Sequence, residues 1–298
     1  MAESAPPVFR FAPSPNGDLH LGHAYSALLN RKMAREAGGR LLLRSEDIDL
    51  ERCRPEYEAA MLDDLAWLGF DHDEQPARQS QNFSAYEAAL DRLKALGVIY
   101  PAFMSRKEIV AAIGPWAATW PVDPDGAPLY PDRDRYLSVE ERKAFTQDRP
   151  NHAWRLDMAK AIELRNTQQD QLLSWQETGE GPDGETGIIH AAAERWGDVV
   201  LARTLVPTSY HLAVVVDDAE QGVTDVVRGR DLFHATSVHR LLQDLLGLPQ
   251  PTYHHHRLIL DGDGRKLSKS IKSQSLRAMR ESGLEPRDVV SMVGLNPD

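Results

Sequence analysis

The sequence is poor in cysteine and has no long apolar run, and both absences limit the classes of protein it can encode. Its one cysteine, Cys53, cannot form a disulfide within the chain, which fits a reducing compartment. No stretch of about 18 apolar residues occurs, so a membrane-spanning helix is not expected. The N-terminus, MAESAPPVFRF, lacks the basic and apolar regions of a secretory signal. These absences favour a cytoplasmic protein.

Metal-binding patterns are also missing. One cysteine cannot build a thiolate zinc site within the chain. His254, His255 and His256 are consecutive, but neighbouring side chains on a strand point to opposite faces, so the three cannot all bind one ion. We therefore expect no metal site, and we interpret the histidine run as part of a buried or phosphate-proximal strand.

Length and charge set the scale of the protein. With 298 residues, of which 42% are hydrophobic and 27% charged, the chain can form one large domain with an insertion, or two domains. Its net charge of −11 argues against a protein that coats nucleic acid non-specifically. An enzyme that acts on nucleic acid remains compatible with that charge, because binding depends on the local field.

Alternating strand and helix patterns predict a parallel α/β sheet. Strands are predicted over 8–11 and 40–44, and helices over 21–37, 55–68 and 82–96. Residues from about 105 to 190, which include four of the six tryptophans and a polar linker over 176–187, predict an inserted, mixed subdomain with a mobile loop. Regular α/β structure resumes at 198–203, with strands predicted over 211–218, 223–229 and 256–260 and helices over 232–246, 274–282 and 286–294.

Two segments far apart in the sequence carry groups that bind phosphate. The segment 10–23, RFAPSPNGDLHLGH, runs from a strand through a loop into a helix, and places His20 and His23 on the first helical turn. Backbone N–H groups and the helix dipole attract phosphate there. The segment 266–270, KLSKS, carries Lys266 and Lys269 in a loop rich in Gly, Asp and Ser. We interpret the two segments as holding one nucleotide, with Mg²⁺ sharing the charge; a pair of surface or capping histidines is the alternative.

Three charged residues at predicted strand ends suit a small ligand that carries both signs of charge. Arg10 and Arg228 can bind a carboxylate through forked hydrogen bonds, and Glu46 can bind an ammonium group. The carboxyl ends of parallel strands meet at one crevice, so an amino acid with an additional carboxylate would satisfy all three. Structural ion pairs are the alternative interpretation.

These motifs resemble class I aminoacyl-tRNA synthetases of the glutamyl branch. RFAPSPNGDLHLGHAYSALLN, LLLRSEDIDLERC, WLGFDHDE, SYHLAVVVDD, VVRGRDL and GRKLSKS stand in that family's order and approximate spacing, and the match omits only about 105–185. The resemblance implies an α/β fold, with a Rossmann-type parallel-sheet catalytic domain in two halves (1–104 and 191–260). It also implies an inserted α+β acceptor-binding-like subdomain (105–190), and the KLSKS loop with a short C-terminal helical segment (261–298).

Within this branch the chain looks like the glutamyl-queuosine tRNA(Asp) synthetases. It stops about 28 residues after the KLSKS loop, where full glutamyl-tRNA synthetases continue into an anticodon-binding domain, and RGRDLF replaces their RGED. The resemblance implies activation of L-glutamate by ATP as glutamyl-adenylate, without tRNA, and its transfer to the queuosine base in the anticodon of tRNA(Asp). A compact glutamyl-tRNA synthetase that charges tRNA(Glu) at its 3′ end, or a catalytically silent amino-acid- or tRNA-binding module, are the alternatives. We expect a monomer.

The resemblance also assigns roles to individual residues. It implies a glutamate site lined by Arg10, Ala12, Ser14, Glu46, Tyr210 and Arg228, with Arg228 facing the side-chain carboxylate. It implies an ATP site formed by Pro13, His20, Gly22, His23, Lys266 and Lys269, of which His20, His23 and Lys269 would be catalytic. Many relatives carry a zinc site, but Ala102 and Met104 occupy its cysteine positions here. Zinc is therefore expected to be absent, and packing of Phe103, Met104 and the tryptophans is expected to hold that lobe.

Overall fold

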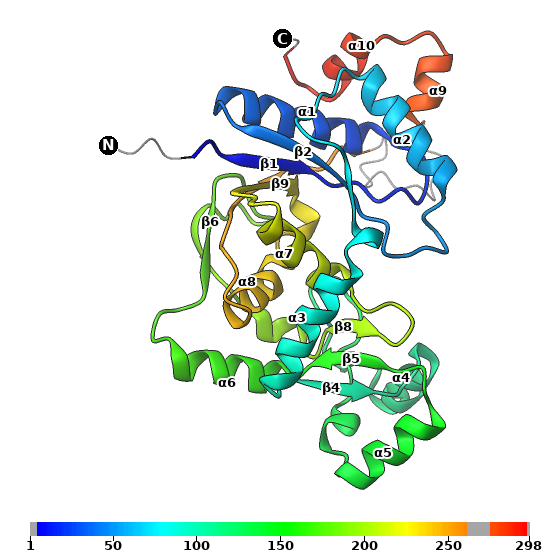
Figure 1. Cartoon of the computed structure of the whole chain (residues 1–298), viewed down its shortest axis with the longest axis vertical. Coiled ribbons are helices and arrows are strands. Elements are labelled where there is room, and N and C mark those ends of the chain that lie inside the picture. Colours follow the sequence, from blue (N-terminus) through cyan, green and yellow to red (C-terminus); the bar gives the residue numbers. More distant parts are fainter. Residues whose placement is uncertain (1–4, 261–274, 297–298) are drawn as a thin grey trace.

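The fold is described from a computed structural model of the chain, shown in Figure 1, for residues 5–260 and 275–296. The helices are α1 (Leu21–Glu36), α2 (Pro55–Trp67), α3 (Phe83–Ala95), α4 (Arg106–Ile113), α5 (Val139–Asp148), α6 (Met158–Gln168), α7 (Tyr210–Glu220), α8 (Thr236–Leu245), α9 (Leu276–Glu281) and α10 (Pro286–Met292). The strands are β1 (Val8–Phe11), β2 (Arg40–Ser45), β3 (Ala77–Arg78), β4 (Ile99–Ala102), β5 (Ala153–Leu156), β6 (Ser174–Glu177), β7 (Gly187–His190), β8 (Val200–Arg203), β9 (Asp225–Gly229) and β10 (Thr252–His256).

A seven-stranded sheet forms the centre of the molecule, with the strand order β3-β2-β1-β9-β10-β6-β7. All neighbouring strands in it are parallel except β6 and β7, which pair antiparallel. The chain moves outward from β1 to β2 and β3 on one side, and places β9 and β10 on the other. The two directions diverge beside β1, and in parallel sheets such a switch point leaves a crevice outside the carboxyl ends of the strands.

The two faces of the sheet bury different kinds of side chain, because successive residues on a strand point to opposite sides. On one face, Phe9 and Phe11 of β1 and Leu41 and Leu43 of β2 pack with apolar residues of α1, α2, α9 and α10. On the other face Arg10 points toward α7, which forms a second core with α3, α6 and α8. This alternation places a buried arginine beside the crevice while its neighbours hold the sheet to α1.

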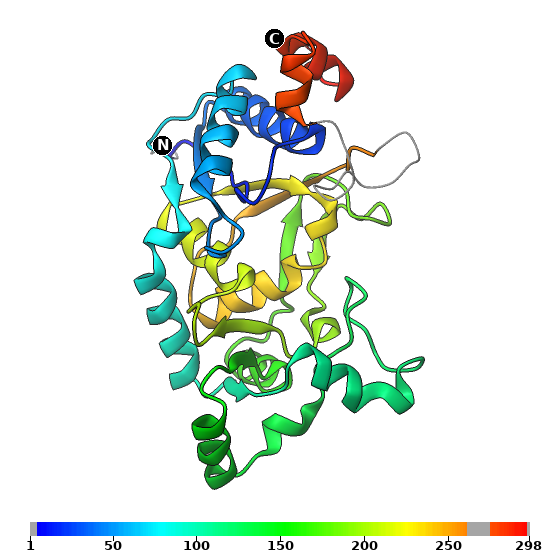
Figure 2. The same ribbon diagram turned by 90° about the vertical axis from the view of Figure 1, so that its right-hand side faces the viewer.

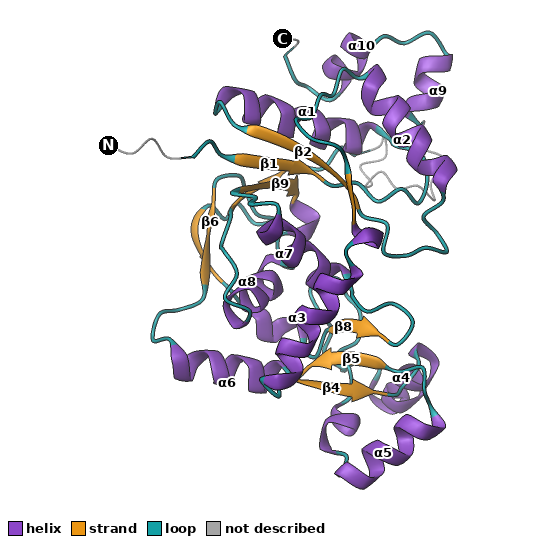
Figure 3. Ribbon diagram, viewed as in Figure 1, coloured by secondary structure: helices purple, strands orange, loops and turns teal. Residues whose placement is uncertain are grey.

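A second sheet of three antiparallel strands has the order β4-β5-β8. It lies with α4 and α5 at one end of the long axis, and α9 and α10 lie at the other end (Figures 1 and 2). The strands β6 and β7 belong to the large sheet, although they fall between residues 105 and 190, whereas β4 and β8 lie outside that range (Figure 3). The expected boundaries of the insertion therefore do not coincide with the sheets, and the division into domains stays a prediction.

The α/β class with a parallel sheet is confirmed, but three local predictions were wrong. Residues 211–218 are helical, as part of α7, and not a strand. Leu212–Asp218 are all buried, and a short apolar run that is buried on every side has the same pattern in a helix as in a strand. The strand predicted over 256–260 lies earlier, as β10, because its register with β9 joins Thr252 to Asp225 and His256 to Gly229. The segment 176–187 is not a linker, because its ends belong to β6 and β7, which pair antiparallel, and 178–186 form the connection of this hairpin.

Candidate functional site

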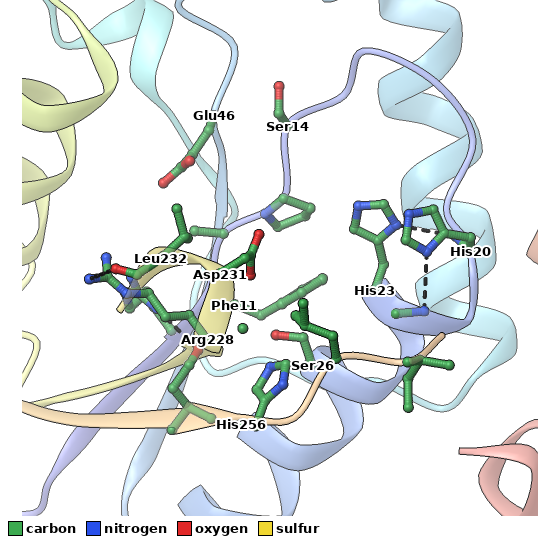
Figure 4. Close-up of a pocket in the computed structure, with 18 of the residues that line it drawn as sticks. Phe11, Ser14, His20, His23, Ser26, Glu46, Arg228, Asp231, Leu232 and His256 are labelled. Carbon is green, nitrogen blue, oxygen red and sulfur yellow. Dashed lines mark hydrogen bonds between the residues drawn. The ribbon is translucent and has the colours of Figure 1, made fainter. Parts of the chain in front are cut away.

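A cavity of about 290 Å³ opens where the carboxyl ends of β1, β2, β9 and β10 meet the first turns of α1 and α7. Figure 4 shows its side chains converging from these elements. It is lined by Arg10, Phe11, Ala12, Pro13, Ser14, His20, Gly22, His23, Ser26, Glu46, Tyr210, Val227, Arg228, Gly229, Asp231, Leu232, His256, Arg257, Leu258 and Ile259.

Ten of the twelve residues expected at the site line this one cavity. They are Arg10, Ala12, Pro13, Ser14, His20, Gly22, His23, Glu46, Tyr210 and Arg228, drawn from segments up to about 200 residues apart. The other two, Lys266 and Lys269, lie outside the described residues. The sequence therefore identified one site, although the roles assigned to these residues stay predictions.

The first turn of α1 is capped by its own histidines. The backbone N–H of Gly22 donates to Nδ1 of His20 at 3.1 Å, and the backbone N–H of His20 donates to Nδ1 of His23 at 3.2 Å. The N–H of His23 also donates to the His20 carbonyl at 2.9 Å. The N–H groups of Gly22 and His23, which were expected to bind phosphate, are therefore already bonded within the turn. In neutral rings whose Nδ1 atoms accept, the proton lies on Nε2, so each ring presents an N–H donor. Capping and phosphate binding are compatible roles here, not alternatives.

Arg10 and Arg44 are both paired with acidic residues of α7. Nε of Arg10 lies 3.1 Å from Asp218, and Nη1 of Arg44 lies 2.8 Å from the same carboxylate oxygen. Burial acts to raise the pKa of Asp218, but the two arginines outweigh it and hold that pKa below its ordinary value. The ion-pair interpretation is therefore correct for Arg10. The neighbouring Asp217 accepts hydrogen bonds from Tyr86 and Gln79, each at 2.7 Å, and so ties α7 to α3.

Glu46 follows β2 and faces the cavity from the side opposite α1 (Figure 4). Its carboxylate lies 3.4 Å from Nη2 of Arg44. Burial raises the pKa of Glu46 above its ordinary value, although Arg44 and Arg10 oppose the shift. An ammonium group bound beside Glu46 would favour the ionised carboxylate.

Arg228, near the end of β9, differs from the other two arginines in having no carboxylate partner among the described residues. Its side chain is buried, and its hydrogen bonds go to neutral groups that include the hydroxyl of Tyr210, 3.3 Å from Nη1. Burial raises the pKa of Tyr210 to about 12, so this hydroxyl stays protonated at neutral pH. Arg228 is therefore a positive charge at the cavity wall that no carboxylate of residues 5–260 and 275–296 balances, which suits a carboxylate ligand.

Sequence reasoning missed several lining residues, among them Ser26, Asp231 and His256. Ser26 lies one turn beyond His23 on α1, so helical spacing could have found it. Asp231 follows β9, and a Cβ at Gly229 would meet its carboxylate oxygen at 2.4 Å, so the glycine allows this close approach. His256 became identifiable only when the register of β10 was known, because that register places it at a strand end.

A second, larger cavity of about 790 Å³ adjoins the first, and Tyr210 lines both. Its walls come from residues 48–52, 102–105, 151–153, 203–206 and 208–210, with Phe83. Both ring nitrogens of His152 and the hydroxyl of Ser209 are buried without a hydrogen-bond partner in the described part of the chain. Buried, unpartnered polar atoms therefore lie beside aromatic rings in the wall of this cavity.

Near Ala102 and Met104, where the resemblance led us to consider cysteine ligands, the hydrogen bonds centre on a carboxylate. Asp134 is fully buried and accepts from the backbone N–H of Phe103 at 2.6 Å, from the Tyr130 hydroxyl and from Arg133. Phe103 stacks on Phe145 at a centroid distance of 5.4 Å. Within 5–260 and 275–296, no group of three His, Cys, Asp or Glu residues could hold a metal ion. Zinc absence stays a prediction, and sequence reasoning did not foresee the role of Asp134.

The described helices include none that combines the length and apolarity needed to cross a membrane.

Known proteins resemble the chain over nearly all its length. Residues 8–296 match the family of class I tRNA synthetases (E and Q), catalytic domain. A Rhodobacter capsulatus protein named Glutamyl-Q tRNA(Asp) synthetase is 46% identical over 97% of this chain and 100% of its own length. A Methylobacterium protein named Glutamate–tRNA ligase 2 is 38% identical over 97% of this chain but 60% of its own length.

A solved structure agrees with these matches. The glutamate tRNA ligase from Elizabethkingia meningosepticum, in complex with its amino acid, superposes with a TM-score of 0.76 at 26% identity. The match covers 97% of this chain and 60% of the ligase. The expected Rossmann-type fold and the resemblance to the glutamyl branch are confirmed, and the chain belongs to the class I tRNA synthetase (E and Q) catalytic-domain family.

Proposed function

We propose that this protein is a ligase that activates L-glutamate with ATP and transfers the glutamyl group to the queuosine base in the anticodon of tRNA(Asp). One observation carries the proposal: a single cavity joins the histidine-capped start of α1 to Arg228, a buried cation with no acidic partner among the described residues. The first end suits a triphosphate and the second a carboxylate. The full-length similarity to the Rhodobacter protein supports the choice of acceptor.

In the first step the α-carboxylate of glutamate attacks the α-phosphorus of ATP, a P–O bond forms, and pyrophosphate leaves with the electron pair of the broken bond. His20 and His23 donate hydrogen bonds to phosphate oxygens as charge shifts during the attack. Glu46 binds the ammonium group and Arg228 the side-chain carboxylate, so the α-carboxylate is held toward the phosphate. Lys269 neutralises the leaving pyrophosphate, a charge that Mg²⁺ bound with the ATP substrate would share, and Lys266 contributes to ATP binding.

In the second step a hydroxyl of the queuosine ring attacks the carbonyl of the mixed anhydride, and AMP leaves. The larger cavity is where we place the acceptor nucleoside, because it shares Tyr210 with the glutamate site. Phe83 and Phe103 lie in its wall for base contacts. The ring nitrogens of His152 are buried without a partner among the described residues, and a turn of the ring toward the cavity would bring them to a polar ring edge. Positioning and charge stabilisation supply the catalysis in both steps.

Glutamate-dependent exchange of pyrophosphate into ATP, measured without tRNA, tests the first step. We expect exchange with L-glutamate and Mg²⁺, and no exchange at saturating glutamate would refute the proposal. Labelled glutamate offered with tRNA(Asp) and tRNA(Glu) in separate reactions tests the second step. Label on the anticodon fragment of tRNA(Asp) is the expected result.

The alternative within the family is a compact glutamyl-tRNA synthetase, which the 38% identity to the Methylobacterium ligase favours. It predicts label on the 3′-terminal adenosine of tRNA(Glu). That ligase is matched over only 60% of its length, whereas the Rhodobacter protein is matched completely, so we rank this alternative second. A silent binding module predicts no exchange at all. Independence of zinc, a monomeric state and a cytoplasmic location also remain predictions.

A further inference from the structure

Arg228 donates its hydrogen bonds to a shell of uncharged acceptors. Nε donates to Nε2 of His255 at 3.1 Å, and Nη2 donates to the Thr236 hydroxyl at 2.7 Å. Nη1 lies 3.2 Å from Nδ1 of His239 and 3.3 Å from the Tyr210 hydroxyl. Nη2 also donates to the Leu232 carbonyl at 3.3 Å, so each of the five N–H groups has a neutral acceptor. The guanidinium is therefore fixed in direction, and within the described residues no carboxylate balances its positive charge.

His255 can accept from Arg228 only in one tautomer, and Glu177 selects that tautomer. Nδ1 of His255 lies 2.6 Å from Oε2 of Glu177, and both side chains are fully buried. A carboxylate accepts hydrogen bonds and cannot donate them, so the proton lies on Nδ1. Burial lowers the pKa of His255 to about 4, although the bond to Glu177 opposes this shift. At neutral pH the ring is therefore neutral, and Nε2 carries the lone pair that Arg228 requires.

The Glu177 carboxylate is itself held ionised by N–H donors. It accepts from the backbone N–H groups of His255 at 2.8 Å and Gly179 at 2.9 Å, and from the Trp175 indole at 3.2 Å. Burial alone would raise its pKa, but the hydrogen bonds, chiefly from His255, hold that pKa below its ordinary value. A Cβ at Gly179 would lie 2.3 Å from the His255 carbonyl oxygen, so only glycine lets the β6–β7 hairpin approach β10 this closely.

We propose that Glu177 and His255 are positioning residues that orient Arg228 toward the ligand and leave its charge available, so that the site selects a carboxylate side chain over a carboxamide. Glu177 does not line the cavity, and it lies in a segment with no motif in the sequence. N–H dipoles, and not Arg228, balance the charge of Glu177. Glu177 therefore orients His255, and through it Arg228, without acting as a counter-ion for Arg228. The inference rests on the proposed function, because it takes glutamate as the ligand of Arg228.

The variant His255→Asn tests whether His255 positions Arg228 or only holds β10 to Glu177. The asparagine amide ends near the position of Nδ1, so it can still donate to Glu177 but is too short to reach Arg228. Glu177→Gln, which keeps the size of the side chain, is the second variant. Its amide N–H₂ group would face N–H donors that now point at a carboxylate oxygen, so those hydrogen bonds would be lost. Tyr253→Phe is the matched control, because it removes a buried hydrogen bond to Gln243 from the same strand.

Calorimetric titration with glutamate and glutamine, together with pyrophosphate exchange, gives the readout. We expect His255→Asn to raise the Kd and KM for glutamate roughly tenfold, the size of a lost hydrogen bond to a charged group, with a much smaller change in kcat. The preference for glutamate over glutamine should fall by a similar factor. Tyr253→Phe should leave both values as in the wild type.

The positioning role is overturned if the wild type uses glutamate and His255→Asn matches Tyr253→Phe in its affinity for glutamate and its preference for glutamate over glutamine. The proposed function would still stand in that case. If His255→Asn does not fold, Glu177→Gln decides by the same criteria. If wild type itself neither binds glutamate nor supports exchange, the proposed function fails and the positioning role fails with it.

Discussion

Nδ1 of His23 accepts a hydrogen bond from the backbone N–H of His20 at 3.2 Å, and the two imidazole rings lie 3.9 Å apart between centroids. The same turn has Nδ1 of His20 accepting from Gly22, so the two histidines cap α1 reciprocally. The cap fixes Nδ1 of each ring as an acceptor, which in a neutral ring leaves the proton on Nε2. A structural role for these side chains thereby supports the chemical role we propose.

Substitutions at His20 should separate these two roles. His20→Ala should lower the free energy of unfolding by about 1 kcal/mol, the usual value of an N-cap, and slow pyrophosphate exchange by about 10²-fold. His20→Asn should recover the stability, since asparagine is a good N-cap, but not the exchange rate. Chemical denaturation and exchange assays on both variants check this. Recovery of the rate in His20→Asn would show that His20 acts only as a cap.

Lys269→Ala should slow adenylate formation severely and leave glutamate binding nearly unchanged, because the proposed role of Lys269 lies late in the phosphate chemistry. A single-turnover measurement of adenylate formation and a titration with glutamate measure the rate and the binding separately. Lys143→Ala, on α5, is a control for the loss of one positive charge. Equal loss of binding and rate in Lys269→Ala would contradict this role.

His152→Phe should leave glutamate-dependent exchange unchanged and reduce transfer to tRNA. The phenyl ring keeps the aromatic contacts with Phe103 and Trp154, each at 5.4 Å, but removes the two nitrogens that face no partner among the described residues. A lost hydrogen bond of about 0.5–1.5 kcal/mol corresponds to roughly a twofold to tenfold lower transfer efficiency. Unchanged transfer would place the acceptor nucleoside elsewhere.

The protein should lose stability as the pH falls from about 6.5 toward 4. Burial lowers the pKa of His211 and of His255 to about 4, and that of His239 well below its ordinary value. In this window the unfolded chain binds protons that the folded protein excludes, so each histidine contributes a slope of up to about 1.4 kcal/mol per pH unit.

Two acids oppose this trend, because burial raises the pKa of Asp64 to about 6 and also raises that of Glu46. A comparison with His211→Gln, which removes one titrating ring, isolates the histidine contribution. Denaturant titrations from pH 7 to 4.5 should give a shallower dependence of the unfolding free energy for this variant. Parallel curves for the two proteins would exclude a neutral buried His211.

Chelation of metal ions should not destabilise the lobe around Ala102 and Met104, whereas a change at Asp134 should. EDTA is expected to leave the thermal unfolding temperature unchanged. Asp134→Asn should lower the unfolding free energy by about 1–3 kcal/mol, because the amide cannot accept from Phe103, Tyr130 and Arg133 together. A fall in unfolding temperature with EDTA that zinc reverses would contradict the expected absence of this metal.

Local patterns in the sequence determined the first half of the sheet and the main members of the site. Val8–Phe11 and Leu21–Glu36 were predictable because an apolar strand, a loop broken by Pro and Gly and an amphipathic helix follow one another directly. The charged residues at strand ends pointed to one crevice, since parallel strands place their carboxyl ends together. These features depend on residues that are close together in the chain, so they can be predicted from the sequence alone.

Tertiary structure decided which charges are already neutralised. Arg10 and Arg228 are the same residue type at similar places on two strands. Asp218 of α7 pairs with Arg10, whereas the described partners of Arg228 are all neutral groups. This difference depends on α7 being a helix, and a fully buried apolar run does not distinguish helix from strand. The link from Glu177 through His255 to Arg228 likewise joins three strands at a register that only the completed sheet fixes, because hydrogen-bond geometry depends on contacts between residues distant in the chain.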